Sequence, residues 1–152
     1  MRLLVPSAAG LLLLSTVAFL SPACAEQTPD LAGVLSAADW SKMESVSVAM
    51  TEYAFSPSTI VLKEGTPTRV VLNNAGKAAH YFVAERFFRS IATRKIQDSN
   101  GEIKAPYFTA VEVYPGKTVE WFLVPVQKGV YDLLCTVKGH AEHGMKGTIE
   151  VR

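Results

Sequence analysis

A thiol, two imidazoles and a thioether lie close together near the C-terminus of this 152-residue chain. Cys135, His140, His143 and Met145 fall within one stretch of eleven residues. Thiolate, imidazole and thioether groups together select copper, and two histidines, one cysteine and a weakly bound methionine make a copper site for electron transfer. The chain has only three histidines, so His80 is the one candidate for an imidazole from outside this stretch.

Each candidate ligand also has a simpler interpretation. His80 could be a hydrogen-bonded histidine at the end of a strand, and Cys135 and Met145 could fill core space, as methionine often does. His143 competes with His140 for the same role. The spacing after Cys135 favours His140, which leaves His143 as a loop residue facing solvent, with a second, weaker metal site as the alternative.

The elements that would position these side chains are short strands. From Ser45 onward, apolar residues alternate with small or polar ones, which is typical of half-buried strands. Turn residues separate the alternating segments at intervals of roughly ten residues, a pattern typical of an antiparallel sandwich or barrel. The predicted strands are 45–50, 60–62, 69–72, 80–83, 110–113, 118–124, 130–135 and 148–151. We therefore predict an all-β fold of seven or eight strands.

Residues Glu85–Tyr107 interrupt this pattern. The spacing of Phe87, Phe88, Ile91 and Ile96 predicts one short amphipathic helix, followed by a turn at residues 98–101. We interpret the segment as a helical insertion between two strands. It also holds the one basic cluster, which is either a solvated face or a docking surface for an acidic partner. The cluster consists of Arg86, Arg89, Arg94 and Lys95.

The N-terminal 25 residues look like an export signal. A positive start, an apolar run and the small residues Ala23-Cys24-Ala25 predict cleavage after Ala25. The alternatives are an uncleaved membrane anchor and a lipoprotein modified at Cys24. Residues 26–44 are predicted to be a tether, with a short helical turn capped by Ser36, and residues 45–152 to be the functional domain. After cleavage Cys135 is the single cysteine, and we expect a periplasmic protein that does not associate with the membrane.

Three segments resemble the cupredoxins, the plastocyanin- and azurin-like small blue copper proteins. Cys-x4-His-x4-Met followed by Lys-Gly-Thr-Ile-Glu-Val resembles their C-terminal copper loop, and Asn-Asn-Ala-Gly-x3-His resembles their upstream ligand segment. The stretch Phe55-x-Pro57-x2-Ile60-x-Leu62-Lys63-x-Gly65 resembles their early strand pair. Together these segments cover most of residues 45–152.

The resemblance implies a Greek-key β-sandwich that binds one type 1 copper ion. By the same resemblance, His80, Cys135 and His140 are the equatorial ligands and Met145 is the axial ligand. It also implies that a backbone N–H of residues 74–76 donates to the Cys135 sulfur. The chain departs from the simplest members in its long insertion, 85–107, and in the second loop histidine, His143.

Three functions stay open at this point. The first is an electron carrier between redox partner proteins, and the second is a copper-binding protein for tolerance, storage or delivery. The third is an interaction module without metal, which leaves the loop spacing unexplained. A methionine in the fourth position leaves no place for substrate, so we expect no enzyme activity. The net charge of +1 argues against nucleic-acid binding, and a monomer is the expectation for the family.

Overall fold

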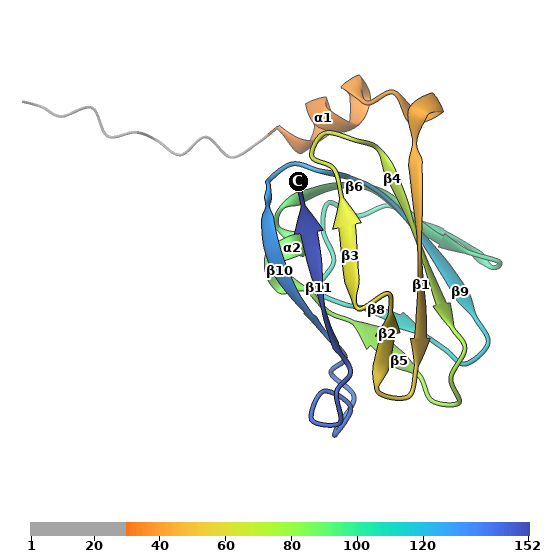
Figure 1. Ribbon diagram of the computed structural model, residues 1–152. Coiled ribbons are helices and arrows are strands. Elements are labelled where there is room, and N and C mark those ends of the chain that lie inside the picture. Colours follow the sequence, from red (N-terminus) through yellow and green to blue (C-terminus); the bar gives the residue numbers. More distant parts are fainter. Residues whose placement is uncertain (1–29) are drawn as a thin grey trace, which may run out of the picture.

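The alternating segments form strands that pair into three sheets, as Figure 1 shows. The computed structural model describes residues 30–152, so the predicted signal peptide, residues 1–25, lies outside the described residues. The strands are β1 (Glu44–Thr51), β2 (Ala54–Ser56), β3 (Thr59–Leu62), β4 (Thr68–Asn74), β5 (His80–Phe82), β6 (Ile91–Asp98), β7 (Gly101–Ile103), β8 (Val111–Val113), β9 (Thr118–Pro125), β10 (Gly129–Leu134) and β11 (Lys146–Val151).

The largest sheet has six strands in the order β2-β1-β4-β9-β6-β7. A second sheet has the order β10-β11-β3, and β5 pairs with β8. The predicted all-β sandwich is confirmed. Most strand pairs are antiparallel, but β1 runs parallel to β4 and β11 runs parallel to β3. These two parallel pairs differ from the purely antiparallel fold that the sequence predicted. The number of strands also exceeds the prediction because β6 lies in the segment expected to be helical and the three-residue strands β2 and β7 were not predicted.

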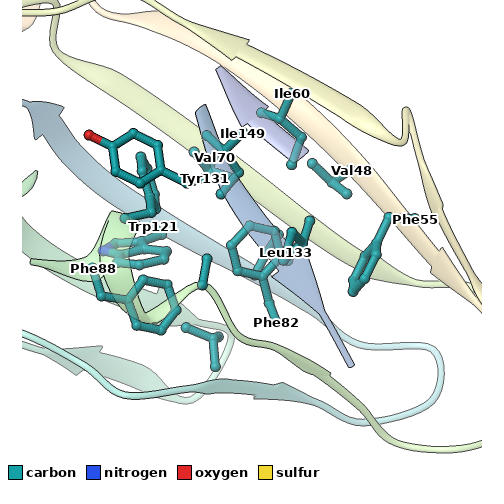
Figure 2. Close-up of a cluster of buried hydrophobic side chains, with 14 of the residues drawn as sticks. Val48, Phe55, Ile60, Val70, Phe82, Phe88, Trp121, Tyr131, Leu133 and Ile149 are labelled. Atoms are coloured by element: carbon teal, nitrogen blue, oxygen red, sulfur yellow. The ribbon is translucent and has the colours of Figure 1, made fainter. Parts of the chain in front are cut away.

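The core lies between the sheets, where most strands turn an apolar side inward (Figure 2). Trp121 of β9 is fully buried among aromatic rings, with the Phe88 ring centroid 5.1 Å away. Its indole N–H donates to Thr93 Oγ1 at 3.2 Å, so the one polar atom of the ring is satisfied. Trp121 is therefore a core residue with no unpaired polar atom.

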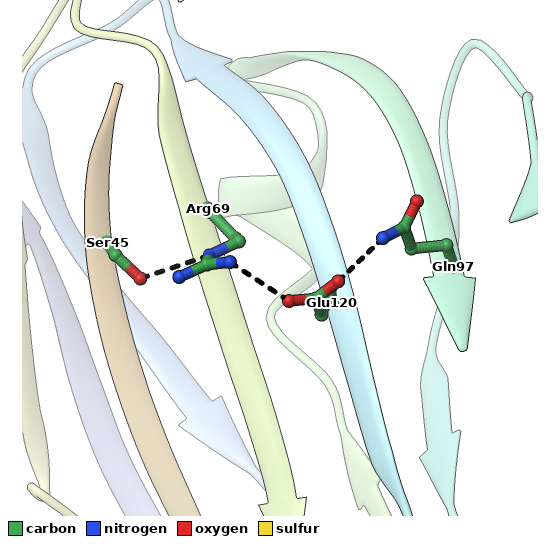
Figure 3. A network of polar contacts seen from close by, with 4 residues as sticks. All are labelled: Ser45, Arg69, Gln97 and Glu120. Carbon is green, nitrogen blue, oxygen red and sulfur yellow. Dashed lines mark hydrogen bonds and ion pairs between the residues drawn. The ribbon is translucent and has the colours of Figure 1, made fainter. Parts of the chain in front are cut away.

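The six-stranded sheet has a polar outer face. A chain of hydrogen bonds crosses four adjacent strands through Ser45, Arg69, Glu120 and Gln97 (Figure 3). The Arg69 guanidinium donates to both Ser45 Oγ and the Glu120 carboxylate at 3.2 Å. Polar residues on this face and apolar residues on the other produce the period-two pattern seen in the sequence.

The predicted helical insertion is present but shorter than expected, because Ile91 and Ile96 lie in a strand and not in the helix. The helix α2 has only four residues (Glu85–Phe88), and β6 then pairs with β9 in the large sheet. Ile91, Ala92 and Thr93 are all buried, since this part of β6 is covered on both faces and loses its alternation. A bulge between Thr93 and Lys95 also shifts the register. The turn predicted at residues 98–101 is present and joins β6 to β7.

The predicted basic cluster is not one free patch. The Arg94 guanidinium lies over the Trp40 ring at 4.4 Å, and that of Arg86 lies over the Tyr131 ring at 5.8 Å. The Lys95 ammonium pairs with Glu102 at 2.7 Å. Three of the four cations thus have partners within the chain, which weakens the interpretation as a docking surface.

Residues 31–42, within the predicted tether, form two short helical segments. The helix α1 (Leu31–Ala37) lies against β6 and is capped by Asp30, whose side chain accepts from the Gly33 N–H at 3.0 Å. A 3₁₀ turn follows at Trp40–Lys42, with Asp39 as its cap. The caps are these aspartates and not Ser36, whose hydroxyl donates back to the Gly33 carbonyl. Within residues 30–152, no helix has the length and apolar character needed to cross a membrane.

Candidate metal centre

The predicted ligands gather at one end of the sandwich. The loop between β10 and β11 extends from this end, and α1 lies at the opposite end (Figure 1). His80 is the first residue of β5. A β-bridge between Val83, just after β5, and Leu134, the residue before Cys135, places β5 beside β10 at this end. We call the segments 52–53, 75–80 and 135–145 together the loop end.

Three of the four predicted ligands have their donor atoms side by side. The Nδ1 atoms of His80 and His140 are 3.2 Å apart, and Cys135 Sγ is 3.6 Å from His140 Nδ1. One ligand atom from each residue lies within 4.8 Å of the others. Two imidazole nitrogens and a sulfur at these separations can surround a single ion, and this donor set suits copper.

The loop itself is folded by its own backbone. The Met145 N–H donates to the His140 carbonyl at 2.9 Å, and the Cys135 N–H donates to the Met145 carbonyl at 3.1 Å. The backbone at Gly139 and Gly144 has φ of +83° and +109°, which glycine adopts more easily than other residues. The loop thus returns Met145 to the neighbourhood of Cys135, and its side chain is fully buried. Its assignment as axial ligand stays a prediction.

The site is closed to solvent on most sides. His80 and Cys135 are completely buried, and His140 is 9% exposed. Burial lowers the pKa of His80 below its ordinary value, and the nearby His140 lowers it further. A neutral imidazole is the form that binds a metal, so this environment suits the role of ligand.

The hydrogen-bond donor to the thiol is not the one that the resemblance implied. The Tyr81 N–H donates to Cys135 Sγ at 3.4 Å. The backbone N–H groups of residues 74, 75 and 76 donate instead to the Lys117 carbonyl, the Met50 carbonyl and Asn74 Oδ1, in that order. The expectation was wrong because Tyr81, which follows His80 in β5, points its backbone N–H at the sulfur.

Asn74 organises the segment before His80 instead. It is fully buried, and its Nδ2 donates to the carbonyls of Ala78 at 2.8 Å and Val113 at 2.7 Å. These bonds tie residues 75–79 to the end of β4 and to β8. The asparagine therefore positions the strand that carries His80.

His143 does not join the three donor atoms. It is exposed, its ring stacks on Tyr53 with centroids 4.8 Å apart, and its Nδ1 faces the Gly139 carbonyl. The same Tyr53 ring meets His140 edge-on at 5.3 Å. Tyr53 is not among the residues predicted from the sequence. It lies in the turn between β1 and β2, and only the fold brings that turn beside the loop between β10 and β11.

His80 leaves one polar atom unsatisfied. Its Nε2 is the one buried side-chain nitrogen or oxygen in residues 30–152 without a hydrogen-bond partner. A buried polar atom without a hydrogen-bond partner costs about 1–3 kcal/mol. With Nδ1 directed at His140, Nε2 has to carry the hydrogen in a metal-binding neutral ring, so this atom needs an acceptor.

Comparisons with known proteins bear on both fold and metal. Residues 11–151 match the family of cupredoxin-like domains. The copper-resistant cuproprotein CopI of Rubrivivax gelatinosus is 28% identical over 109 residues, which are 71% of this chain and 66% of that protein. The match therefore spans slightly less than two thirds of the relative's length.

Among solved structures, the chain is similar to a reduced auracyanin from Roseiflexus castenholzii, with a TM-score of 0.52 and 19% identity over 71% of this chain and 96% of that one. It is also similar to a multi-copper oxidase from Pseudomonas thermotolerans, with a TM-score of 0.59 and 24% identity. That match covers 76% of this chain but 31% of the oxidase. At such identities these likenesses show the fold alone.

Proposed function

The chain belongs to the cupredoxin-like family, and on that premise we propose that it is an exported blue copper protein that carries single electrons between redox partners. The family and the cluster of His80, Cys135 and His140 support copper as the metal. The finer proposal is one type 1 ion, with Met145 as the axial ligand. The observation that carries it is the closed geometry of the site, with two ligands fully buried and the third nearly so.

Copper in such a site would alternate between two oxidation states, and the protein's task is to keep its ligands in place during that change. The Tyr81 N–H restrains the sulfur, while the backbone bonds between Cys135, His140 and Met145 close the loop. Ligands held by a packed sandwich move little, so little reorganisation accompanies electron transfer. The same closure leaves no open position for a substrate, and we therefore propose a carrier and not an enzyme.

The electron would leave through His140. This is the one member of the cluster with an exposed edge, and the half-exposed Tyr53 ring lies against it. A partner that docks on this part of the loop end would come closest to the metal. We propose a redox protein as that partner, with the periplasm as its compartment.

The visible and EPR spectra of the purified protein, titrated with Cu(II), test this proposal. We expect an intense blue band from thiolate-to-copper charge transfer and a narrow copper hyperfine splitting, saturating at one ion per chain. Fast electron self-exchange of the loaded protein would support the carrier function. An ordinary tetragonal Cu(II) spectrum, or no binding, would overturn it.

A second candidate function is copper tolerance, storage or delivery. It is favoured by one observation, the relative whose name describes a copper-resistant cuproprotein. A protein with this role would bind copper tightly, exchange electrons slowly and protect cells against added copper. Loss of copper tolerance on deletion of the gene, restored by the wild type but not by Cys135→Ser, would favour this function over the carrier.

A further inference from the structure

The unsatisfied nitrogen of His80 faces a narrow gap whose other side is a carboxylate. A Cβ built on Gly76 would lie 2.8 Å from His80 Nε2 and 2.8 and 2.9 Å from the two carboxylate oxygens of Glu52. Both groups thus border the same small space, which stays open only because residue 76 has no side chain. Glu52 belongs to the turn between β1 and β2, far from His80 in the sequence.

The position of Glu52 is set by the segment that leads to His80. Its carboxylate accepts hydrogen bonds from the backbone N–H groups of Lys77 and Ala78, the second at 3.0 Å. These bonds lower the pKa of Glu52 below its ordinary value, and the bond from Lys77 has the largest effect. The group is therefore a carboxylate at neutral pH. A negative acceptor therefore lies beside a buried ring nitrogen that has no hydrogen-bond partner.

We propose that Glu52 is the positioning residue of His80. Its carboxylate accepts the Nε2 hydrogen across the gap over Gly76, directly after a small side-chain rotation or through one water. Either form keeps the hydrogen on Nε2 and leaves Nδ1 free to bind the metal. Outer carboxylates of this kind orient a ligating histidine and make it a stronger donor. This inference deepens the proposed function, on which its copper-dependent part rests.

The metal-free protein allows a test that does not depend on copper. The Nδ1 atoms of His80 and His140 are within hydrogen-bond distance, so one of them carries the hydrogen and the other accepts it. If Glu52 holds the hydrogen of His80 on Nε2, then His140 is the donor. We expect ¹⁵N NMR of the ring nitrogens to show a single tautomer in the wild type and a mixture in Glu52→Gln, which keeps an oxygen for Lys77 and Ala78 but has no charge.

Two further variants separate this role from general electrostatics. Glu142→Gln removes the same charge from an exposed position two residues from His140, and we expect it to leave the His80 tautomer unchanged. Gly76→Ala places a methyl group in the gap, at a residue whose backbone is not in the left-handed region, so we expect it to disturb the tautomer as Glu52→Gln does. A wild-type tautomer in Glu52→Gln, or an equal change in Glu142→Gln, would overturn the proposal.

The loaded protein gives a second measurement. A stronger donor favours Cu(II), so we expect Glu52→Gln to weaken Cu(II) binding by about 10-fold and Cu(I) binding by less, which raises the reduction potential. Equal loss for both oxidation states would contradict this part. If the wild type never turns blue, the proposed function fails, while the tautomers of the metal-free protein still decide the role of Glu52.

Discussion

In the sandwich core, buried side chains are apolar or have their polar atoms paired, as with Trp121 and its bond to Thr93. At the loop end, by contrast, His80 is just as deeply buried and keeps a nitrogen without a partner. The core is stabilised by filling volume, so similar shapes can replace one another there. The loop end holds groups whose identity matters for chemistry, and its packing serves to place them.

The difference predicts that a chemical change and a volume change have separable effects. Cys135→Ser keeps almost the same shape but removes the sulfur, so we expect complete loss of the blue band while the fold is retained. Visible spectra after Cu(II) addition and far-UV circular dichroism measure the two effects. A variant that stays blue would refute the assignment of Cys135 as a ligand.

A truncation in the core should do the reverse. Trp121→Ala removes a fully buried ring that contacts several other aromatic rings, and we expect it to lower the free energy of unfolding by about 3–5 kcal/mol. Denaturant titration of the metal-free protein measures this loss. Under conditions where the variant is folded, its blue spectrum should match the wild type, and a changed spectrum would show that core and site are not separable.

Met145 belongs to both regions, since it is buried and a predicted ligand. Met145→Leu conserves volume, so we expect it to cost less than about 1.5 kcal/mol. It should keep the blue colour and raise the reduction potential, because an apolar axial position favours Cu(I). An unchanged potential, measured by voltammetry, would make Met145 a core residue only.

The two loop histidines sharpen the comparison within the loop end. We expect His143→Ala to keep the blue band and to lose only its stacking on Tyr53, worth about 0.5–1.5 kcal/mol at most. His140→Ala, the matched control, should abolish the blue spectrum. The opposite result would mean that His143 and not His140 is the ligand.

The smallest effect is expected on the surface of the sandwich. Lys95 and Lys104 pair with Glu102 and lower the pKa of its carboxyl below the ordinary value of 4.5. Because the folded-state pKa of Glu102 lies below 4.5, its ionised carboxylate stabilises the folded protein above pH 4.5. This contribution is lost as the pH falls through the folded-state pKa. We therefore expect Glu102→Gln to be slightly less stable than wild type at pH 7 and to lose this difference in acid, as thermal melts at both pH values can measure. A difference that grows in acid would contradict the pairing.

Much of this arrangement could be predicted from local patterns. The alternation of residues predicted the strands, because a strand with one buried face records its burial in every second residue. The spacing of Cys135, His140 and Met145 predicted which residues gather, since a short loop between paired strands keeps its members close. The same local signals failed for β6, where burial on both faces removes the alternation.

Contacts between distant segments were decided only by the tertiary structure. Nothing local indicates that the Tyr81 N–H meets the Cys135 sulfur, that Tyr53 lies against His140, or that Glu52 borders the same gap as His80. Each depends on how separate strands are placed relative to one another, and that placement results from packing the whole core. The residue types thus determine the chemistry available to this protein, while the packed sandwich determines which atoms meet and which of them remain without a partner.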